Sequence, residues 1–230
     1  MFNKTKVFFE DFKNKKFKET WVYQTKLFNN IINIKLYNRL NKNKIKIVPN
    51  YLLFVEHNHV YTLGKRGSYK NLLFNKIIKK KSIFKIDRGG DITYHGPGQL
   101  VCYPIFDITN FDLDIYKYLR FLEEVIIKLI YNYCIKGYRI YNETGVWVNN
   151  KKKINKICAI GIRISRLVTM HGFALNVNTD LSYFNNIIPC GIKNKGVTSI
   201  NVETRYIIYM YEVKLLLKKY LIYFFKIKFI

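Results

Sequence analysis

The alternation of apolar and polar residues predicts helices towards both ends of the chain. Residues 19–40 carry apolar side chains at a helical spacing, Leu27 and Ile31 among them, and this pattern predicts an amphipathic helix. A second helix is expected over residues 112–134, where acidic residues come first and suit the positive end of the helix dipole. A third is expected over residues 213–225.

Short apolar runs between these helices predict β-strands. The runs are residues 51–56, 83–86, 100–105, 145–148, 157–164 and 168–177. Because strands and helices do not alternate regularly, the pattern predicts an α/β protein of the α+β type, with a mixed, largely antiparallel sheet and packed helices. No repeat and no Gly/Ser- or Pro-rich linker divides the 230 residues, so we expect a single domain.

Composition excludes several classes of protein. Hydrophobic residues make up 49% of the chain, which excludes disorder as the main state. The apolar runs are too short for a transmembrane helix, and residues 1–20 mix acidic side chains with lysines and lack a signal-like apolar stretch. The four cysteines have no CxxC spacing, so neither a disulfide scaffold nor a zinc site is expected. We therefore expect a soluble, cytoplasmic protein without a bound metal.

The net charge of +25, from 40 Lys+Arg and 15 Asp+Glu, raises the possibility of nucleic-acid binding. The lysines are scattered along the whole chain, however, and the abundance of Lys, Asn, Ile, Tyr and Phe also fits drift in an AT-rich genome. No RNP, KH or zinc-finger pattern accompanies the charge. A solvated basic surface, which would attract acidic protein partners, is the favoured interpretation, and neither nucleic acid nor a membrane is expected as a partner.

One segment concentrates glycines and polar side chains: residues 88–99, RGGDITYHGPGQ, between two predicted strands. Its glycines allow the backbone to approach a ligand closely, and Arg88, Thr93, His95 and Gln99 supply polar groups. It matches neither the Walker nor the GxGxxG motif, so it does not predict a nucleotide site. A long hairpin with turn glycines remains the structural alternative.

Two strand segments combine polar and small residues. Lys156 begins the run KICAIGIR, in which Ala159 and Gly161 lie on one strand face and leave room for a ligand. The run HGFALN, residues 171–176, repeats the arrangement of small residues after His171. Lys156 could equally be a solvated strand end, and His171 a structural histidine.

The segment PCG, residues 189–191, places Cys190 between a rigid and a flexible residue. A cysteine in such a loop is a better candidate nucleophile than Cys134 in a predicted helix, or than Cys102 and Cys158 in predicted strands. An inert thiol is the alternative.

In this order, the four segments resemble the octanoyltransferases of lipoate biosynthesis. The resemblance extends to EH at residues 56–57, VYTLG at 60–64 and VTS at 197–199, and covers residues 51–200 or so. It implies the fold of the catalytic domain of biotin and lipoate protein ligases. It also implies one catalytic domain over residues 1–230, with helices at about 19–40 and 205–225 flanking the motifs.

The resemblance implies roles for individual residues. Cys190 corresponds to the acyl-accepting nucleophile and Lys156 to its partner. The acyl-binding surface corresponds to Arg88, Gly89, Gly90, Asp91, Ile92, Thr93, Tyr94, His95, Ala159, Ile160, Gly161, Gly172, Phe173 and Ala174. Candidate donors to the thioester oxygen are His95 and backbone N–H groups near Gly172 or Cys190.

The implied reaction transfers an octanoyl group from octanoyl-acyl carrier protein, through a cysteine thioester, to a lysine of a lipoyl domain. The acceptors implied are the E2 subunits of 2-oxoacid dehydrogenases and the glycine cleavage H protein. A thioester is already activated, so no cofactor and no ATP are expected. The alternative is an ATP-dependent lipoate or octanoate ligase of the same fold, for which Cys190 would be incidental.

Overall fold

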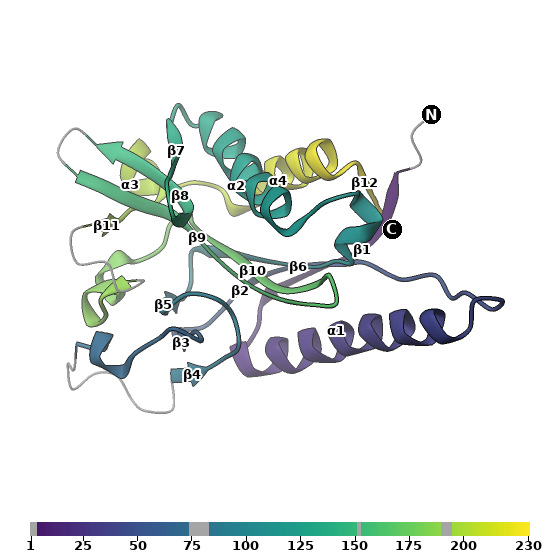
Figure 1. The fold of residues 1–230 in the computed structure, drawn as a ribbon. Helices are drawn as coiled ribbons and strands as arrows, with labels where there is room; N and C mark the ends of the chain where they lie inside the picture. Colours follow the sequence, from purple (N-terminus) through teal and green to yellow (C-terminus); the bar gives the residue numbers. More distant parts are fainter. Residues whose placement is uncertain (1–3, 74–82, 151–152, 190–194) are drawn as a thin grey trace.

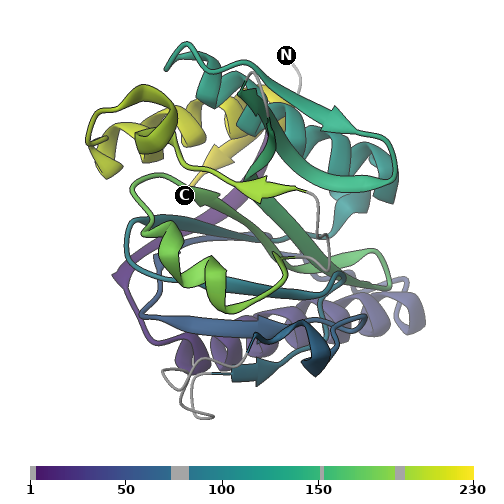
Figure 2. The same ribbon diagram turned by 90° about the vertical axis from the view of Figure 1, so that its left-hand side faces the viewer.

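A central β-sheet separates two layers of helices (Figure 1). The structure, a computed structural model, describes residues 4–73, 83–150, 153–189 and 195–230. Two helices, α2 (Ile115–Tyr131) and α4 (Met210–Phe225), cover one face of the sheet, and the long helix α1 (Phe17–Leu40) lies on the other. The view turned by 90° shows the same layers, with a small second sheet beside α1 (Figure 2).

Within the described residues the large sheet has nine strands, in the order β12-β1-β2-β6-β10-β9-β8-β7, with β11 added beside β9. Its strands are β1 (Thr5–Asn14), β2 (Tyr51–Glu56), β6 (Gln99–Ile105), β7 (Gly137–Ile140), β8 (Glu143–Asn150), β9 (Lys153–Ser165), β10 (Val168–Asn176), β11 (Gly196–Val197) and β12 (Ile227–Phe229). Most neighbours are antiparallel, whereas β1 pairs in parallel with both β2 and β12. The expected mixed, largely antiparallel sheet is confirmed.

The second sheet has three strands in the order β4-β3-β5. Its strands are β3 (Val60–Leu63), β4 (Ile83–Lys85) and β5 (Ile92–His95). The remaining elements are the short helix α3 (Ile200–Thr204) and the 3-10 helices η1 (Tyr69–Asn71), η3 (Ile108–Phe111) and η4 (Leu181–Asn186). No helix in the described parts of the chain is long and apolar enough to cross a membrane.

The two helical layers exist because successive residues of a strand face opposite sides of the sheet. In β6, Leu100 and Cys102 pack in the core under α2 and α4, whereas Val101 and Tyr103 pack in the core under α1. Helix α1 supplies Leu27, among others, to this second core. Strands buried on both faces read as continuous apolar runs, and for this reason β2 and β6 were predictable from the sequence.

The three predicted helices are confirmed, with shifted ends. Helix α2 starts at Ile115 because the Asp114 carboxylate accepts a hydrogen bond from the Lys117 N–H at 2.7 Å and caps the helix. It ends at Tyr131, so the helix predicted to reach Cys134 is too long. Cys134 lies in the following turn with a φ of +57°.

Two expectations about strands were incomplete. The glycine segment 88–99 was expected as a loop, but its residues Ile92–His95 form β5, paired with β3. Strand β1 was not predicted, because charged residues interrupt the apolar pattern to which Val7 and Phe9 belong. Tertiary pairing with β2 and β12 decides its conformation.

The close approach of β6 to β10 requires a glycine at position 172. A Cβ atom built there would lie 2.2 Å from the backbone oxygen of Cys102. We predict that Gly172→Ala lowers the free energy of unfolding by about 1–3 kcal/mol, because overpacking must push the two strands apart. Urea denaturation measures the change. The control is Gly89→Ala, whose Cβ would meet only the Ile162 oxygen, at 3.5 Å, and should change stability by less than about 0.5 kcal/mol. Equal effects of the two variants would contradict the prediction.

Candidate active site

Both sheets line a cavity of about 450 Å³. This volume lies within the range of small-molecule sites. Apolar side chains from α1, β6, β9 and β10 form much of its wall: Phe17, Val101, Ala159, Ile160, Phe173 and Ala174. Polar groups enter from β5, from the segment before it, and from Lys156 on β9. The cavity therefore combines this apolar wall with polar and charged side chains, which make up about half of its lining residues.

The floor of the cavity is made of small residues that face each other across two strands. Ala159 of β9 pairs with Ala174 of β10, and Gly161 pairs with Gly172. All four residues line the cavity. The sequence predicted the small residues within each strand but not that they are partners in register, and this pairing leaves space above the sheet.

The predicted acyl-binding residues of β5 divide between two faces. Thr93 and His95 line the cavity, whereas Ile92 and Tyr94 belong to a separate buried cluster with Tyr61. The alternation of a strand causes this division. Among the other predicted residues, Arg88, Gly90 and Asp91 line the cavity and Gly89 does not. The Gly89 N–H instead donates to the Ile162 oxygen at 2.9 Å and ties the segment to β9.

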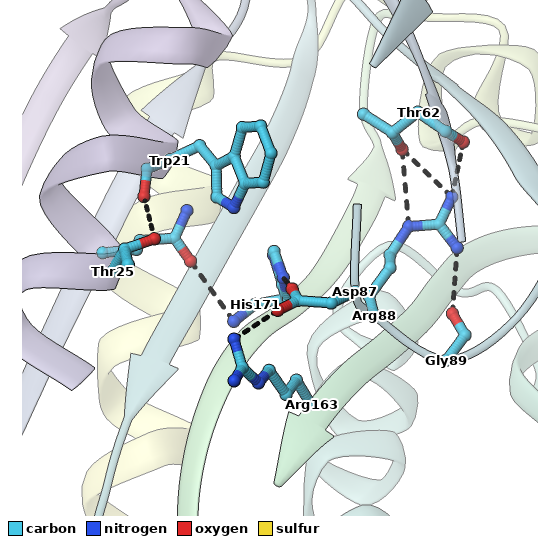
Figure 3. A network of polar contacts seen from close by, with 9 residues as sticks. Trp21, Thr25, Thr62, Asp87, Arg88, Gly89, Arg163 and His171 are labelled. Carbon is cyan, nitrogen blue, oxygen red and sulfur yellow. Dashed lines mark hydrogen bonds and ion pairs between the residues drawn. The ribbon is translucent and has the colours of Figure 1, made fainter. Parts of the chain in front are cut away.

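Arg88 is held at the cavity wall by the neighbouring strand β3 (Figure 3). Its Nη2 donates to the backbone oxygen of Thr62 at 2.7 Å and to Thr62 Oγ1 at 3.0 Å. Its Nη1 donates to the Gly89 oxygen at 2.9 Å. Only 8% of Arg88 is exposed, so this side chain is a fixed, largely desolvated positive charge beside the cavity.

A second polar cluster joins β10 to the segment before β5. The Asp87 carboxylate pairs with Arg163 and accepts a hydrogen bond from His171 Nε2 at 3.0 Å (Figure 3). The His171 hydrogen bond and the Arg163 charge keep the pKa of Asp87 below its usual value. Burial lowers the pKa of His171 despite the carboxylate. His171 thus connects the floor of the cavity to the Arg88 segment, which agrees with a structural role.

The protonation of His95 is set by a chain of hydrogen bonds. Gln99 donates through Nε2 to Asn176 Oδ1 at 2.9 Å, so its Oε1 accepts from His95 Nδ1 at 2.7 Å. Burial lowers the pKa of His95 to about 3, so the ring is neutral and its Nε2 carries no hydrogen. Nε2 faces Thr62 Oγ1 at 3.4 Å. In this tautomer His95 cannot donate to a thioester oxygen, contrary to one expectation from the sequence.

The same chain of hydrogen bonds reaches Lys156. Asn176 Nδ2 donates to the Thr198 oxygen at 2.9 Å, and the Thr198 N–H donates to the Lys156 oxygen at 3.0 Å. Lys156 is only 9% exposed, and its Nζ lies 4.4 Å from the centre of the Trp147 ring. Burial and this cation–π contact show that Lys156 is not a solvated strand end.

Tyr103, at the cavity wall, is hydrogen-bonded to His57. The sequence did not indicate this pair. Tyr103 lines the cavity, and its hydroxyl lies 2.8 Å from His57 Nε2. His57 Nδ1 lies 2.8 Å from the Lys15 oxygen and must donate to it, so Nε2 accepts from the Tyr103 hydroxyl. Burial lowers the pKa of His57 to about 4. In the sequence His57 was part of the resemblance only, and nothing near Tyr103 indicated this contact.

A smaller pocket adjoins the cavity and shares with it the lining residues Thr93, Lys156, Ala159 and Ala174. Pro189, the residue before Cys190 in the sequence, also lines this pocket. Cys190 itself lies outside the described residues. Lys156 and the beginning of the PCG segment, 33 residues apart in the sequence, therefore meet at one pocket.

A profile of the lipoyl protein ligase A/B catalytic domain matches residues 29–222. The chain belongs to this family. An octanoyltransferase of Flavobacterium psychrophilum is 56% identical over 205 residues, covering 87% of this chain and 88% of that protein. One of Christiangramia forsetii is 57% identical over 193 residues, covering 82% of each chain. The relationship predicted from the motifs is confirmed, and the chain is an acyltransferase.

Solved structures show that the lipoyl protein ligase A/B fold extends over almost the whole chain. A lipoate-protein ligase A bound with ATP has a TM-score of 0.66 at 17% identity, covering 99% of this chain and 88% of that one. A bipartite lipoate protein ligase from Thermoplasma acidophilum, solved with its E2 lipoyl domain, has a TM-score of 0.67 at 14% identity, covering 99% and 86%. The expected fold is confirmed.

The cysteines that the structure describes are poor candidates for the nucleophile that the sequence predicts. Burial raises the pKa of the Cys102 thiol well above its usual value and also raises that of Cys158. Neither Cys102, Cys134 nor Cys158 is among the residues that line the cavity. These observations leave Cys190 as the candidate.

Of the described residues that line the cavity, Asp91 and Glu143 are acidic. Asp91 holds its own segment together, because it accepts hydrogen bonds from the backbone N–H groups of Ile92 and Ser68 and from Asn71 Nδ2. Glu143 pairs with Lys195 Nζ at 2.5 Å. Among the described residues no three His, Cys, Asp or Glu side chains are grouped so that they could hold a metal ion.

The buried histidines predict a loss of stability in acid. His57, with a pKa near 4, and His95, with a pKa near 3, titrate near 6.5 when unfolded. Between these values the unfolded chain binds more protons, so the free energy of unfolding is greatest above pH 6.5 and falls as the pH is lowered. Each histidine lowers the free energy of unfolding by up to about 1.4 kcal/mol for each pH unit of acidification. Urea denaturation from pH 7 to pH 4 should show a shallower slope for His57→Gln. The exposed His59, changed to Gln, is the control, and identical slopes for wild type and His57→Gln would contradict the prediction.

Proposed function

We propose that this acyltransferase moves an octanoyl group from octanoyl-acyl carrier protein to a lysine of a lipoyl domain, through a thioester on Cys190. The name shared by relatives at up to 57% identity supports the octanoyl group. The archaeal ligase solved with its E2 lipoyl domain supports a lipoyl domain as acceptor. The observation that carries the proposal is the pocket at which Lys156 and Pro189, the neighbour of Cys190, come together.

The cavity suits an aliphatic chain. The paired alanines and glycines of β9 and β10 leave an apolar floor, and Phe17 and Val101 add apolar wall. Burying about seven methylene or methyl groups at ~0.8 kcal/mol each contributes on the order of 5 kcal/mol before the costs of binding. The thioester end of the chain would then lie towards Lys156.

Lys156 has the properties of a partner for a thiolate. A free thiol is only a few per cent ionised at neutral pH, and a nearby ammonium group favours the thiolate. Lys156 is buried against Trp147, and the Asn176–Thr198 hydrogen bonds hold its backbone. Its charge is therefore held at a fixed place on the pocket wall.

The atoms and protons of the proposed reaction balance. The Cys190 thiolate attacks the thioester carbon, and the carrier-protein sulfur leaves and takes a proton from Lys156. The acceptor lysine, after losing one proton to solvent, attacks the new thioester. Its second proton goes to the neutral Lys156 as the amide forms and the Cys190 thiolate leaves. No ATP is consumed, in contrast to the alternative ligase reaction.

The covalent intermediate is directly testable. Incubation with octanoyl-acyl carrier protein should add one octanoyl group to the protein, removable by hydroxylamine and visible by intact mass. The Cys190→Ser variant should show no turnover, whereas Cys134→Ser, at an exposed site away from the cavity, should retain it. Full activity of Cys190→Ser would contradict the proposed nucleophile, and pyrophosphate release from ATP with free octanoate would indicate the ligase reaction instead.

The role of Lys156 predicts a pH profile. If its ammonium group favours the Cys190 thiolate, alkylation of Cys190 should remain fast below pH 8, and Lys156→Ala should move the profile to higher pH. Iodoacetamide labelling followed by mass spectrometry measures the rates. Lys153→Ala, an exposed lysine on the same strand, is the control. An unchanged profile in Lys156→Ala would refute activation by this lysine.

A further inference from the structure

Glu143 is an acidic residue of the cavity wall with one carboxylate oxygen that accepts no hydrogen bond from the described residues. It begins β8, and its side chain pairs with Lys195 through Oε1 at 2.5 Å. The other oxygen, Oε2, is buried and has no hydrogen-bond partner among the described residues. A buried carboxylate oxygen without a donor is costly, so it is suited to receive a donor from a ligand.

The surroundings of Glu143 already bind ammonium groups. Lys156 Nζ lies 4.4 Å and Lys195 Nζ 5.0 Å from the centre of the same Trp147 ring. Lys195 also lines the smaller pocket with Lys156. The Glu143–Lys195 pair is thus an example, within the chain itself, of a lysine side chain bound between this carboxylate and this ring.

The acceptor in the proposed function presents the same chemical group. A lysine ε-ammonium that approaches a chain with a net charge of +25 is repelled unless an acidic group receives it. Asp91, the other acidic residue at the cavity, is committed to hydrogen bonds within its own segment. Glu143 is the remaining carboxylate on the wall of the described cavity.

We infer that Glu143 receives the ε-ammonium group of the acceptor lysine and positions it beside Lys156. The inference rests on the proposed function and adds a residue that selects the second substrate. Glu143 acts on binding and forms no bond to the acyl group. Because it stabilises the charged lysine before deprotonation, its loss weakens acceptor binding more than it slows the chemical step.

The test compares a charged and an uncharged acceptor. Glu143→Gln keeps the shape of the side chain and removes its charge, and it should raise the KM for a purified lipoyl domain about tenfold while kcat changes less than twofold. Transfer to hydroxylamine, which is uncharged at neutral pH, should proceed at the wild-type rate. The octanoyl adduct formed from octanoyl-acyl carrier protein should also be unaffected.

Glu124→Gln is the matched control. Glu124 is as exposed as Glu143, 27% against 26% for the side chains, and is also ion-paired, with Arg139 at 2.6 Å, but it does not line the cavity. It should leave the KM for the lipoyl domain unchanged.

The results that would contradict the inference differ from those that would contradict the proposed function. A Glu143→Gln enzyme with an unchanged KM for the lipoyl domain would overturn the inference and leave the proposed function standing. An equal loss with the lipoyl domain and with hydroxylamine would also overturn it, because it would assign Glu143 a structural role. A wild-type enzyme without an octanoyl adduct and without transfer would overturn the proposed function itself.

Discussion

The site depends on the pairing of β9 with β10 at positions where neither strand carries a large side chain. Ala159 faces Ala174 and Gly161 faces Gly172, so the two central strands form a floor with an open volume above it. The two glycines also serve the packing around them. A Cβ at Gly172 would strike the backbone of β6, and one at Gly161 would lie 3.0 Å from the Gly89 oxygen. Gly161 and Gly172 therefore meet a requirement of the fold and a requirement of the cavity at once.

Beside this floor, one chain of polar groups is held in place by burial and by hydrogen bonds. His95 is held by Gln99, and Gln99 by Asn176, which in turn reaches the backbone at Lys156 through Thr198. Buried groups linked in this way keep one tautomer and one orientation, because any alternative leaves a donor or an acceptor unsatisfied. His95 is neutral in this arrangement, because burial lowers its pKa, and the neutral ring has no hydrogen on Nε2 to donate.

The sequence was sufficient for the parts of the molecule that follow from local patterns. The buried strands β2, β6 and β10 and the three long helices follow from apolar periodicity, and the motifs indicated the family. Sequence could not place partners that meet through tertiary structure: the Tyr103–His57 pair, the register of Ala159 with Ala174, and strand β1 with its neighbours β2 and β12. It also treated residues 88–95 as one surface, although the alternation of β5 turns Tyr94 away from the cavity.

The charge of the chain and the chemistry of the site place opposite demands on the enzyme. A basic surface favours the approach of acidic protein domains by long-range attraction. In the reaction that we propose, however, the group that enters the pocket is itself a cation, and Lys156 is positive for the first transfer and neutral for the second. Attracting an acidic domain to the surface therefore needs positive groups, whereas binding its lysine in the pocket needs a negative one. We infer that the carboxylate of Glu143, on the cavity wall, provides this negative group, and a single carboxylate leaves the basic surface almost unchanged.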